Sequence, residues 1–511
     1  MRIGIDIGTH TARAAYVGPN GQPQLIHLPS GADSMPAMVR QTMHGLVVGE
    51  EAAQALVGNS ETTVVGCTRL MGRASNIPAR LVERLPFGLR DAGGEALCNL
   101  LFAEVRVSAI YGAIIAALVK AATQATGQVI DEVVLTVPAS AEDRFRVQAR
   151  SAAEAHGLRV RRLINQPTAA LLALGDIGQR VAVVSCAGGT TEVSIAERSQ
   201  HGVRVLASSG DALLGGDDMA WLVAEQINRR LQHEAGVDIF AVGDSHTAAQ
   251  GLRHASEQAM QALSHTANTR LVLDHGAGFG RDLLIPLTNT ELREWLEPVG
   301  IQIMALCKRV LQAAQFKPAQ IDRVVLIGDW AFLPALATAV AKAFRRTPAE
   351  LHREHAEALA AWGAALAAEQ VGGSIWDVTP YPLGINCYYG ETELLSPIIR
   401  ANTAIPTAPV GHPGAFTESY QTRFPDQTSV RLDVLQYRGT RNADPHGPER
   451  VTPSECEVLG SWEFRGLKPK PGRSASFSVT FAIDHDGILH LTACETDTGH
   501  TLSAQINRTI G

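Results

Sequence analysis

Two similar glycine-containing segments, far apart in the chain, constrain the fold more than any other feature of the sequence. Residues 3–9 (IGIDIGT) and 181–190 (VAVVSCAGGT) are apolar runs that end in a turn of small residues closed by threonine. A second apolar run follows each turn, at 12–17 and 192–196. Two apolar runs joined by a short glycine turn predict a β-hairpin. The sequence therefore predicts the same hairpin in both halves of one α/β domain.

Hairpin tips of this kind can hold an anion, because glycine has no Cβ and leaves the backbone N–H groups accessible. One such loop alone is more often a plain turn. Two of them at equivalent places in two halves favour a clamp that grips a triphosphate from both sides. The candidate residues are Gly8, Thr9, Gly188, Gly189 and Thr190.

The rest of the chain divides into an α/β part and an all-β part. Up to residue 371, short β-branched runs alternate with helical stretches, which is typical of an α/β domain. The expected strands are 3–7, 132–137, 181–185, 203–208 and 323–327. The expected helices are 108–123, 143–154, 219–234 and 290–314. We expect a linker at 372–378 and a β-sandwich at 379–511, where strands of period two include 430–434, 477–483 and 488–491.

Composition excludes several classes of protein. The net charge of −7 argues against a nucleic-acid partner, since such proteins are usually basic. Seven scattered cysteines without a CxxC pair argue against a disulfide framework or a zinc site. Asp6 interrupts any signal peptide, and no uncharged apolar run reaches the length of a membrane span. We expect a cytoplasmic protein that does not bind membranes.

Further motifs extend along the whole chain in a fixed order. They include 135–139 (LTVPA), 162–170 (RLINQPTAA), 209–217 (SGDALLGGD), 325–328 (VLIG), 377–380 (DVTP), 402–406 (NTAIP) and 486–489 (DGIL). Together with IDIGT at 5–9, they resemble the heat shock protein 70 family of chaperones. The resemblance implies an actin-like (duplicated ribonuclease-H-like) nucleotide-binding domain followed by a β-sandwich that binds unfolded or extended polypeptide. It also implies ATP and Mg²⁺ as cofactors, and a J-domain co-chaperone and a nucleotide-exchange factor as partners.

This chain departs from the family at charged positions of the nucleotide site. The resemblance places a lysine at Thr68, a glutamate at Gln166 and an aspartate at Ser185. Asp6 and Thr190 remain as candidate catalytic residues, and Asp6 and Glu192 as residues that hold Mg²⁺ through water. Phosphoryl transfer depends on positioning and on charge aimed at the migrating group. We therefore expect ATP hydrolysis to be very slow or lost.

The resemblance also assigns residues around the nucleoside. Glu257 and Ser264 match positions that touch ribose and base, whereas Met260 replaces a lysine. Gly215, Gly216 and Gly328 match backbone positions near the nucleotide, and we expect the first two to approach a phosphate. Phe332 either stacks on adenine or packs in the core.

His10 follows directly after Thr9 at the tip of the first hairpin. We expect its side chain to face solvent. The alternative is that a protonated imidazole replaces part of the missing lysine's charge.

Other residues match positions that the family uses to couple its domains or to bind peptide. The interdomain candidates are Pro138, Arg146, Arg162, Asp377, Asp484 and Asp486. The peptide-binding candidates are Leu383, Ile385, Tyr388, Tyr420, Arg423, Val430 and Leu432. Apolar residues of period two are also the pattern of a sandwich core. We expect Tyr388 and Arg423 to stack as a cation–π pair that narrows the peptide groove.

Two functions follow from these expectations. The first is a chaperone that binds ATP and extended peptide, with weak hydrolysis and with fast peptide release, because no helical lid follows the β-sandwich in this sequence. The second is a non-hydrolysing scaffold, a pseudo-ATPase dedicated to one protein partner. A small-molecule kinase is disfavoured, because the linker and sandwich motifs resemble those of chaperones.

Overall fold

The structure is a computed structural model, and it contains two compact units. It describes residues 1–56, 58–73, 77–175, 178–199, 202–241, 245–273, 282–370, 374–439, 445–446, 449–468, 472, 474–505 and 508–510. The first unit comprises residues 1–140 and 148–375, and the second comprises residues 141–147 and 376–511. Residues 372 and 373 of the expected linker lie outside the described residues, and residues 374–378 form the strand β19.

The first half of the first unit is built around the hairpin of β1 (Arg2–Ile7) and β2 (Thr11–Val17), which are antiparallel. The sheet has the order β12-β11-β1-β2-β3, with β11 (Glu132–Val137) parallel to both β1 and β12 (Arg159–Asn165). Helix α11 (Leu359–Ala368) packs on this sheet. A Cβ on Gly4 would lie 2.2 Å from the backbone nitrogen of Ala365, so the helix can approach this closely only over a glycine.

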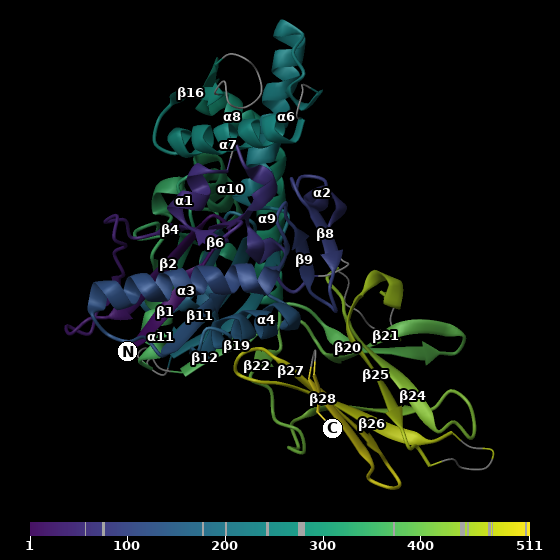
Figure 1. The fold of residues 1–511 in the computed structure, drawn as a ribbon. Coiled ribbons are helices and arrows are strands. Elements are labelled where there is room, and N and C mark those ends of the chain that lie inside the picture. The colour runs from purple at the N-terminus through teal and green to yellow at the C-terminus, as the bar shows by residue number, and fades with distance from the viewer. Residues whose placement is uncertain are drawn as a thin grey trace. The chain divides into compact units, whose positions relative to one another are not determined.

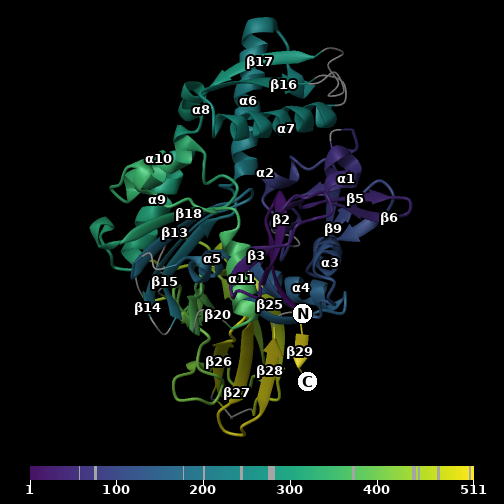
Figure 2. The same ribbon diagram turned by 90° about the vertical axis from the view of Figure 1, so that its left-hand side faces the viewer.

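The second half repeats this arrangement; Figure 1 labels strands of the first half, and Figure 2 labels those of the second half. Strands β13 (Arg180–Cys186) and β14 (Thr191–Ser199) form the second hairpin, and β18 (Arg323–Ile327) runs parallel to β13. Both predicted hairpins are therefore confirmed. Buried apolar residues of α6 (Gly216–Ala235), α7 (Ser245–Leu263), α9 (Glu297–Ala313) and α10 (Pro334–Ala343) form one core with these strands.

One predicted helix is wrong. The expected helix 290–314 is two helices, α8 (Asn289–Trp295) and α9 (Glu297–Ala313), which meet at Leu296. Pro298 has no backbone N–H to donate to the carbonyl four residues earlier, so it can sit in the first turn of a helix but not in the interior of one. Pro298 therefore accounts for the break.

The remaining elements of the first unit complete its surface. Its other helices are α1 (Glu50–Gln54), α2 (Ala79–Val82), α3 (Val107–Thr126), α5 (Gln166–Ala173) and α4 (Asp143–Glu154), the last of which begins in the second unit. Its other strands are β3 (Pro23–Leu25), β4 (Met35–Pro36), β5 (Met38–Thr42), β6 (Gly45–Val48), β7 (Thr63–Val65), β8 (Gly88–Asp91), β9 (Ala96–Asn99), β10 (Glu104–Arg106), β15 (Gly202–Asp211), β16 (Asn268–Leu273) and β17 (Leu283–Thr288).

Helix α3 passes a simple test for a membrane span. Among the described residues, it is long and apolar enough to cross a membrane, although it contains Lys120. Half of its most apolar stretch is buried inside the protein, and the helix contacts β2, β5 and β6. These contacts are those of a core helix.

The second unit is a sandwich of two antiparallel sheets. One sheet has the order β21-β20-β24-β25, and the other has the order β23-β26-β27-β28-β29. Figure 2 shows β26, β27 and β28 side by side in the second of these sheets. Side chains of both sheets share one buried core. The strands of the two sheets are β20 (Leu383–Tyr389), β21 (Thr392–Ile399), β23 (Phe416–Gln421), β24 (Ser429–Gln436), β25 (Glu457–Arg465), β26 (Ser476–Ile483), β27 (Leu489–Glu495), β28 (Thr501–Gln505) and β29 (Arg508–Ile510). The short strand β22 (Ala404–Ile405) belongs to neither sheet and pairs with β19.

Candidate functional site

The tips of the two matching hairpins touch each other inside the first unit. A Cβ on Gly188 would lie 2.4 Å from Nδ1 of His10, and a Cβ on Gly189 would lie 2.6 Å from Oγ1 of Thr9. Any larger residue at these two positions would push the loops apart. The prediction that the hairpins face each other is therefore confirmed.

A small cavity lies where the strands of the two hairpins end. Its volume is about 30 Å³, which leaves room for only a few water molecules. The structure brings together here six of the residues singled out from the sequence, namely Asp6, Gly8, Gln166, Ser185, Gly188 and Gly328.

Asp6 is held by two hydrogen bonds inside this cavity. Its Oδ1 accepts from Oγ1 of Thr136 at 2.5 Å and from Nε2 of Gln166 at 2.8 Å. Burial raises the pKa of Asp6, while the two hydrogen bonds act in the opposite direction. The amide of Gln166 thus supports the carboxylate of Asp6 but adds no negative charge of its own.

Glu192 does not border the small cavity. Although its side chain is fully buried, Oε2 accepts the backbone N–H of Ala139 at 2.8 Å, and Oε1 accepts the N–H and the hydroxyl of Ser140. These bonds hold the carboxylate on the chain after β11. The prediction that Glu192 orders water around Mg²⁺ therefore gains no support from its position.

The side chain expected to replace a lysine lies beside the first hairpin. Oγ1 of Thr68 is 3.5 Å from Oγ1 of Thr9. The next residue, Arg69, lies across the second hairpin, because a Cβ on Gly189 would be 2.8 Å from its Cγ. Thr68 thus lies beside the first loop, and threonine supplies no charge there.

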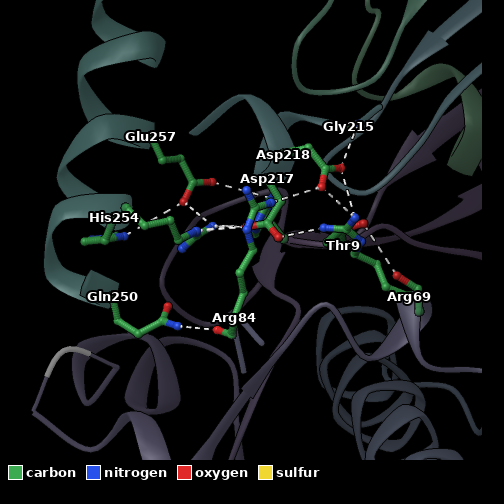
Figure 3. A network of polar contacts seen from close by, with 12 residues as sticks. Thr9, Arg69, Arg84, Gly215, Asp217, Asp218, Gln250, His254 and Glu257 are labelled. Carbon is green, nitrogen blue, oxygen red and sulfur yellow. Dashed lines mark hydrogen bonds and ion pairs between the residues drawn. The ribbon is translucent and has the colours of Figure 1, made fainter. Parts of the chain in front are cut away.

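A buried network of charges joins the two halves of the first unit (Figure 3). The carboxylate of Asp217 accepts from Nη1 of Arg69 at 2.7 Å and from Nε of Arg253 at 2.8 Å. Arg69 also pairs with Asp218 at 2.9 Å, and Arg253 pairs with Glu257 at 2.9 Å. Burial alone would raise the pKa of Asp217, but the two guanidinium groups hold it well below its usual range.

His10 belongs to this network, so the prediction that it faces solvent is wrong. Its ring is buried, with Nε2 3.0 Å from Nη2 of Arg253. Nδ1 lies 3.5 Å from Oε1 of Glu257 without a hydrogen bond. The ring is covered because α7 brings Arg253 and Glu257 over the hairpin tip.

The first N–H groups of α6 donate to acceptors inside the protein, so the prediction that Gly215 and Gly216 approach a phosphate gains no support from their contacts. The N–H of Gly215 donates to Oδ2 of Asp218, and that of Gly216 donates to the carbonyl of Ala187. A Cβ on Gly216 would lie 1.8 Å from Nε1 of Trp330, so the indole of that residue covers the glycine.

A larger cavity of about 270 Å³ adjoins the small one. It contains three residues predicted for the nucleoside, namely Glu257, Ser264 and Phe332. The ring of Phe332 packs partly against the core and lies 6.0 Å from the ring of His265, so the two interpretations of this residue are compatible. Met260 is fully buried in the core and does not line the cavity.

Four residues border both cavities and form a neck between them, and sequence reasoning missed all of them. They are Thr11, Arg13, Asp329 and Glu357. Asp329 accepts from Oγ1 of Thr11 at 2.8 Å and pairs with Nη1 of Arg13 at 3.3 Å. Glu357 pairs with Nη2 of Arg13 at 3.3 Å. An arginine inside an otherwise apolar run at 11–17 is the signal that could have revealed this site.

In the second unit, five of the seven peptide-binding candidates lie in or beside the core. Leu383, Ile385 and Leu432 are buried in the core between the two sheets, which favours the core interpretation for these three. Tyr420 and Val430 are half-buried beside the same core.

Tyr388 and Arg423 form the predicted cation–π pair. The guanidinium carbon of Arg423 lies 3.8 Å from the centre of the Tyr388 ring, which is 43% exposed. Nη2 of Arg423 also lies 3.1 Å from a carboxylate oxygen of Glu391. The stack is confirmed, whereas its role in peptide binding stays a prediction.

The interdomain candidates occupy defined places within their own units, and their coupling role stays a prediction. In the first unit, Pro138 follows β11, and Arg162 of β12 donates to the carbonyl of Ile375 at 3.5 Å.

In the second unit, Nη1 of Arg146 donates to the carbonyl of Asp486 at 3.0 Å. Two more residues of the second unit accept backbone N–H groups, Asp377 from Val378 and Asp484 from Asp486 and Ile488.

Comparisons with known proteins match the chain over its whole length. The profile of the Hsp70 protein family covers residues 2–511. The chaperone protein HscA of Pectobacterium carotovorum subsp. carotovorum (strain PC1) is 31% identical over 522 residues, which span 100% of this chain and 79% of that protein.

Proposed function

Because this chain belongs to the Hsp70 protein family, we propose that it is a chaperone with two functional domains. The first is an actin-like nucleotide-binding domain at residues 1–371. A linker at 372–378 joins it to a peptide-binding β-sandwich at 379–511. The repeated sheet with its two matching hairpins supports the first assignment, and the two packed antiparallel sheets support the second.

The proposed ligand of the first domain is ATP with Mg²⁺, and the proposed rate of hydrolysis is very low. The observation that carries this proposal is the loss of charge around the hairpin tips. Thr68 lies beside Thr9, while Gln166 and Ser185 border the small cavity. All three side chains are neutral where the family resemblance places a cation and two carboxylates.

The residues present fit a magnesium ion only in part. Mg²⁺ keeps most of its waters in nucleotide sites and needs only one or two protein carboxylates. Asp6 supplies one, and Gln166 occupies the position of the other without a charge. A bound ion would neutralise phosphate charge during transfer, and Thr190 would lie near the terminal phosphate.

The usual effect of removing charged groups from such a site explains why ATP hydrolysis should be slow. Removing one preorganised donor from a site of charge stabilisation lowers turnover by about 10²–10³-fold. Three neutral substitutions in one site therefore leave very little catalysis, even though such effects are not additive. Binding can survive, because the larger cavity depends on other residues.

Calorimetry with Mg·ATP and single-turnover hydrolysis by the whole protein test this proposal. We expect measurable binding, with phosphate release that is barely above the uncatalysed background. Rapid magnesium-dependent release of phosphate would contradict slow hydrolysis, and no binding of any nucleotide would contradict the nucleotide site itself.

Restoring the missing charges tests whether their loss causes the slow hydrolysis. We expect Thr68→Lys, Gln166→Glu and Ser185→Asp together to raise single-turnover hydrolysis at least tenfold. A matched control places the same three changes on exposed residues of the first unit, as Thr290→Lys, Gln124→Glu and Ser30→Asp. The control variant should hydrolyse ATP at the wild-type rate.

For the second domain we propose binding of unfolded or extended polypeptide, with a J-domain protein and a nucleotide-exchange factor as partners. The family membership carries this part of the proposal. A cytoplasmic location agrees with the seven cysteines, all of which are free thiols. Fluorescence anisotropy with a labelled unfolded peptide, with and without Mg·ATP, measures this binding directly.

The second candidate function is a non-hydrolysing scaffold for one protein partner. It is favoured by the start of α6, where internal acceptors already take the N–H groups of Gly215 and Gly216. A scaffold should bind its partner with the same affinity whether or not Mg·ATP is present. A change in peptide affinity on adding Mg·ATP would exclude it.

A further inference from the structure

The two cavities of the first unit differ sharply in the room that they offer. The cavity lined by Ser264 and Phe332 has about 270 Å³, close to the lower end of ordinary ligand pockets, which hold about 300–1,000 Å³. The cavity at the hairpin tips has about 30 Å³. We propose that this site binds its ligand through the nucleoside alone, so that adenosine binds at least as tightly as Mg·ATP. The inference rests on the proposed nucleotide site and specifies which part of the ligand that site recognises.

The backbone N–H groups at the start of α6 already donate hydrogen bonds to acceptors inside the protein. The N–H of Gly216 donates to the carbonyl of Ala187 at 3.0 Å, and that of Asp217 donates to the carbonyl of Gly188 at 2.7 Å. The N–H of Gly215 donates to Oδ2 of Asp218 at 3.1 Å. A helix N-terminus binds phosphate through such N–H groups. Here a phosphate would first have to displace the second hairpin.

The arginines near the hairpin tips already form ion pairs inside the protein. Arg69 pairs with Asp217 and Asp218, and Arg253 pairs with Asp217 and Glu257. The side chains of both arginines are about 5% exposed, so their partners are packed around them. Arg84 belongs to the same network, because it pairs with Asp218 at 3.6 Å and with Glu225 at 3.0 Å. Each of these three arginines therefore already has carboxylate partners and contributes no free positive charge that could attract a polyphosphate.

The neck adds a direct obstacle. A ligand that reaches from the larger cavity to the hairpin tips must pass Asp329 and Glu357, which share the single cation Arg13. A phosphate at the neck would lie beside a surplus negative charge in a partly buried place. Like charges repel at short range, and the repulsion is stronger in a partly buried place than in bulk water. The neck therefore disfavours phosphate.

The larger cavity offers what a nucleoside needs. His10, Ser264, Gln261 and Trp330 line it, and the side chains of His10 and Trp330 are buried. The hydroxyl of Ser264 and the amide of Gln261 are neutral polar groups of the kind that bind ribose hydroxyls and base nitrogens. The rings of Phe332 and His265 provide surfaces on which a base can stack. A neutral base and neutral hydroxyl groups bring no negative charge to the carboxylates of the neck, which also line this cavity.

The test compares adenosine, AMP, ADP and ATP, each with and without Mg²⁺, by calorimetry on the whole protein. We expect dissociation constants that agree within about threefold or that favour adenosine, since RT ln 3 is well below the energy of one charge-assisted hydrogen bond. ADP or ATP binding more than tenfold tighter than adenosine would overturn the inference while leaving the nucleotide site intact. If none of the four ligands binds, both the inference and the proposed nucleotide site fail.

Two variants distinguish the contribution of the nucleoside to binding affinity from that of the phosphates. Asp329→Asn keeps the acceptor for Thr11 and removes one charge, so it should tighten ATP binding severalfold relative to adenosine binding. Glu354→Gln makes the same charge change on an exposed residue outside both cavities and should change neither. Phe332→Ala should weaken adenosine and ATP by the same factor. Tighter binding of adenosine and ATP alike in Asp329→Asn would contradict the role of the neck.

Discussion

Nη1 of Arg69 lies 2.7 Å from Oδ2 of Asp217, and this ion pair joins the first half of the first unit to the start of α6 in the second half. Arg69 immediately follows Thr68, the position at which the family resemblance expects a lysine. The guanidinium group of Arg69, which lies beside the second hairpin, is therefore turned toward internal carboxylates.

Arg69→Ala should destabilise the first unit by about 3–5 kcal/mol, because breaking a buried pair leaves uncompensated charge. Asp217 and Asp218 would both lose their partner at this position. Urea denaturation of the variant measures the loss. Arg159→Ala is the matched control, since Arg159 is 77% exposed and its pair with Glu132 should contribute less than about 1 kcal/mol. Equal losses in the two variants would show that the Arg69 pair is no stronger than a surface contact.

Gly216→Ala should destabilise the protein through a clash with one side chain. A Cβ at position 216 would lie 1.8 Å from Nε1 of Trp330, and inserting a methyl group into such a packed place costs about 1–3 kcal/mol. In a Trp330→Ala background the same change should cost almost nothing, because alanine is otherwise favoured in a helix. A double-mutant cycle by urea denaturation measures the coupling. A Gly216→Ala cost that is the same in both backgrounds would exclude the indole as its cause.

Asp143 predicts a pH dependence of stability in the second unit. It is buried and accepts the backbone N–H of Leu489, and burial raises its pKa to about 7. The folded state then binds a proton more tightly than the unfolded state, so the free energy of unfolding falls as the pH rises from about 4 to 7. Its charged neighbours are Asp484, Arg146 and His490.

Asp143→Asn should remove this dependence, because asparagine keeps an acceptor for Leu489 but cannot ionise. Urea denaturation at pH 5, 6, 7 and 8 should show the wild type losing stability relative to the variant. Asp426→Asn is the control at an exposed aspartate, and its difference from the wild type should stay constant over the same range. A constant difference for Asp143→Asn as well would place the carboxyl pKa near its ordinary value.

Local sequence patterns predicted the elements of the fold well. The expected bounds of β11 and α4 match the structure residue for residue, because each segment has a clear period and clear ends. Both glycine hairpins were also predictable, since a strand, a small-residue turn and a second strand are close together in sequence. The break between α8 and α9 was missed although Pro298 marks it, because the apolar period continues across the proline.

The polar contacts of the site could not be predicted in the same way. His10 is buried because Arg253 lies over it, and these residues are 243 positions apart. Asp329 meets Thr11 from 318 positions away. A local pattern shows that a residue is charged or lies in a turn, but only the tertiary fold decides which partner it meets. The missing charges were visible in the sequence, whereas the internal pairs that fill the site were not.

The last prediction concerns Tyr388 and Arg423 in the β-sandwich. Because the guanidinium carbon lies 3.8 Å from the ring centre at a partly exposed site, the pair should contribute about 0.5–1 kcal/mol. A double-mutant cycle with Tyr388→Leu and Arg423→Met, followed by urea denaturation, isolates this coupling from the loss of each side chain. Arg423→Lys should lose much of it, because an ammonium group cannot lie flat on the ring as a guanidinium does.

The same variants test whether the stack acts on a bound peptide. If Tyr388 and Arg423 bridge over the peptide, Arg423→Met should raise the dissociation rate of a labelled peptide severalfold and change the association rate little. Glu391→Gln is the control, because it removes the exposed ion pair of Arg423 and leaves the stack in place. A dissociation rate that rises in Glu391→Gln as much as in Arg423→Met would assign the effect to the ion pair. An unchanged rate in both variants would confine the stack to a structural role.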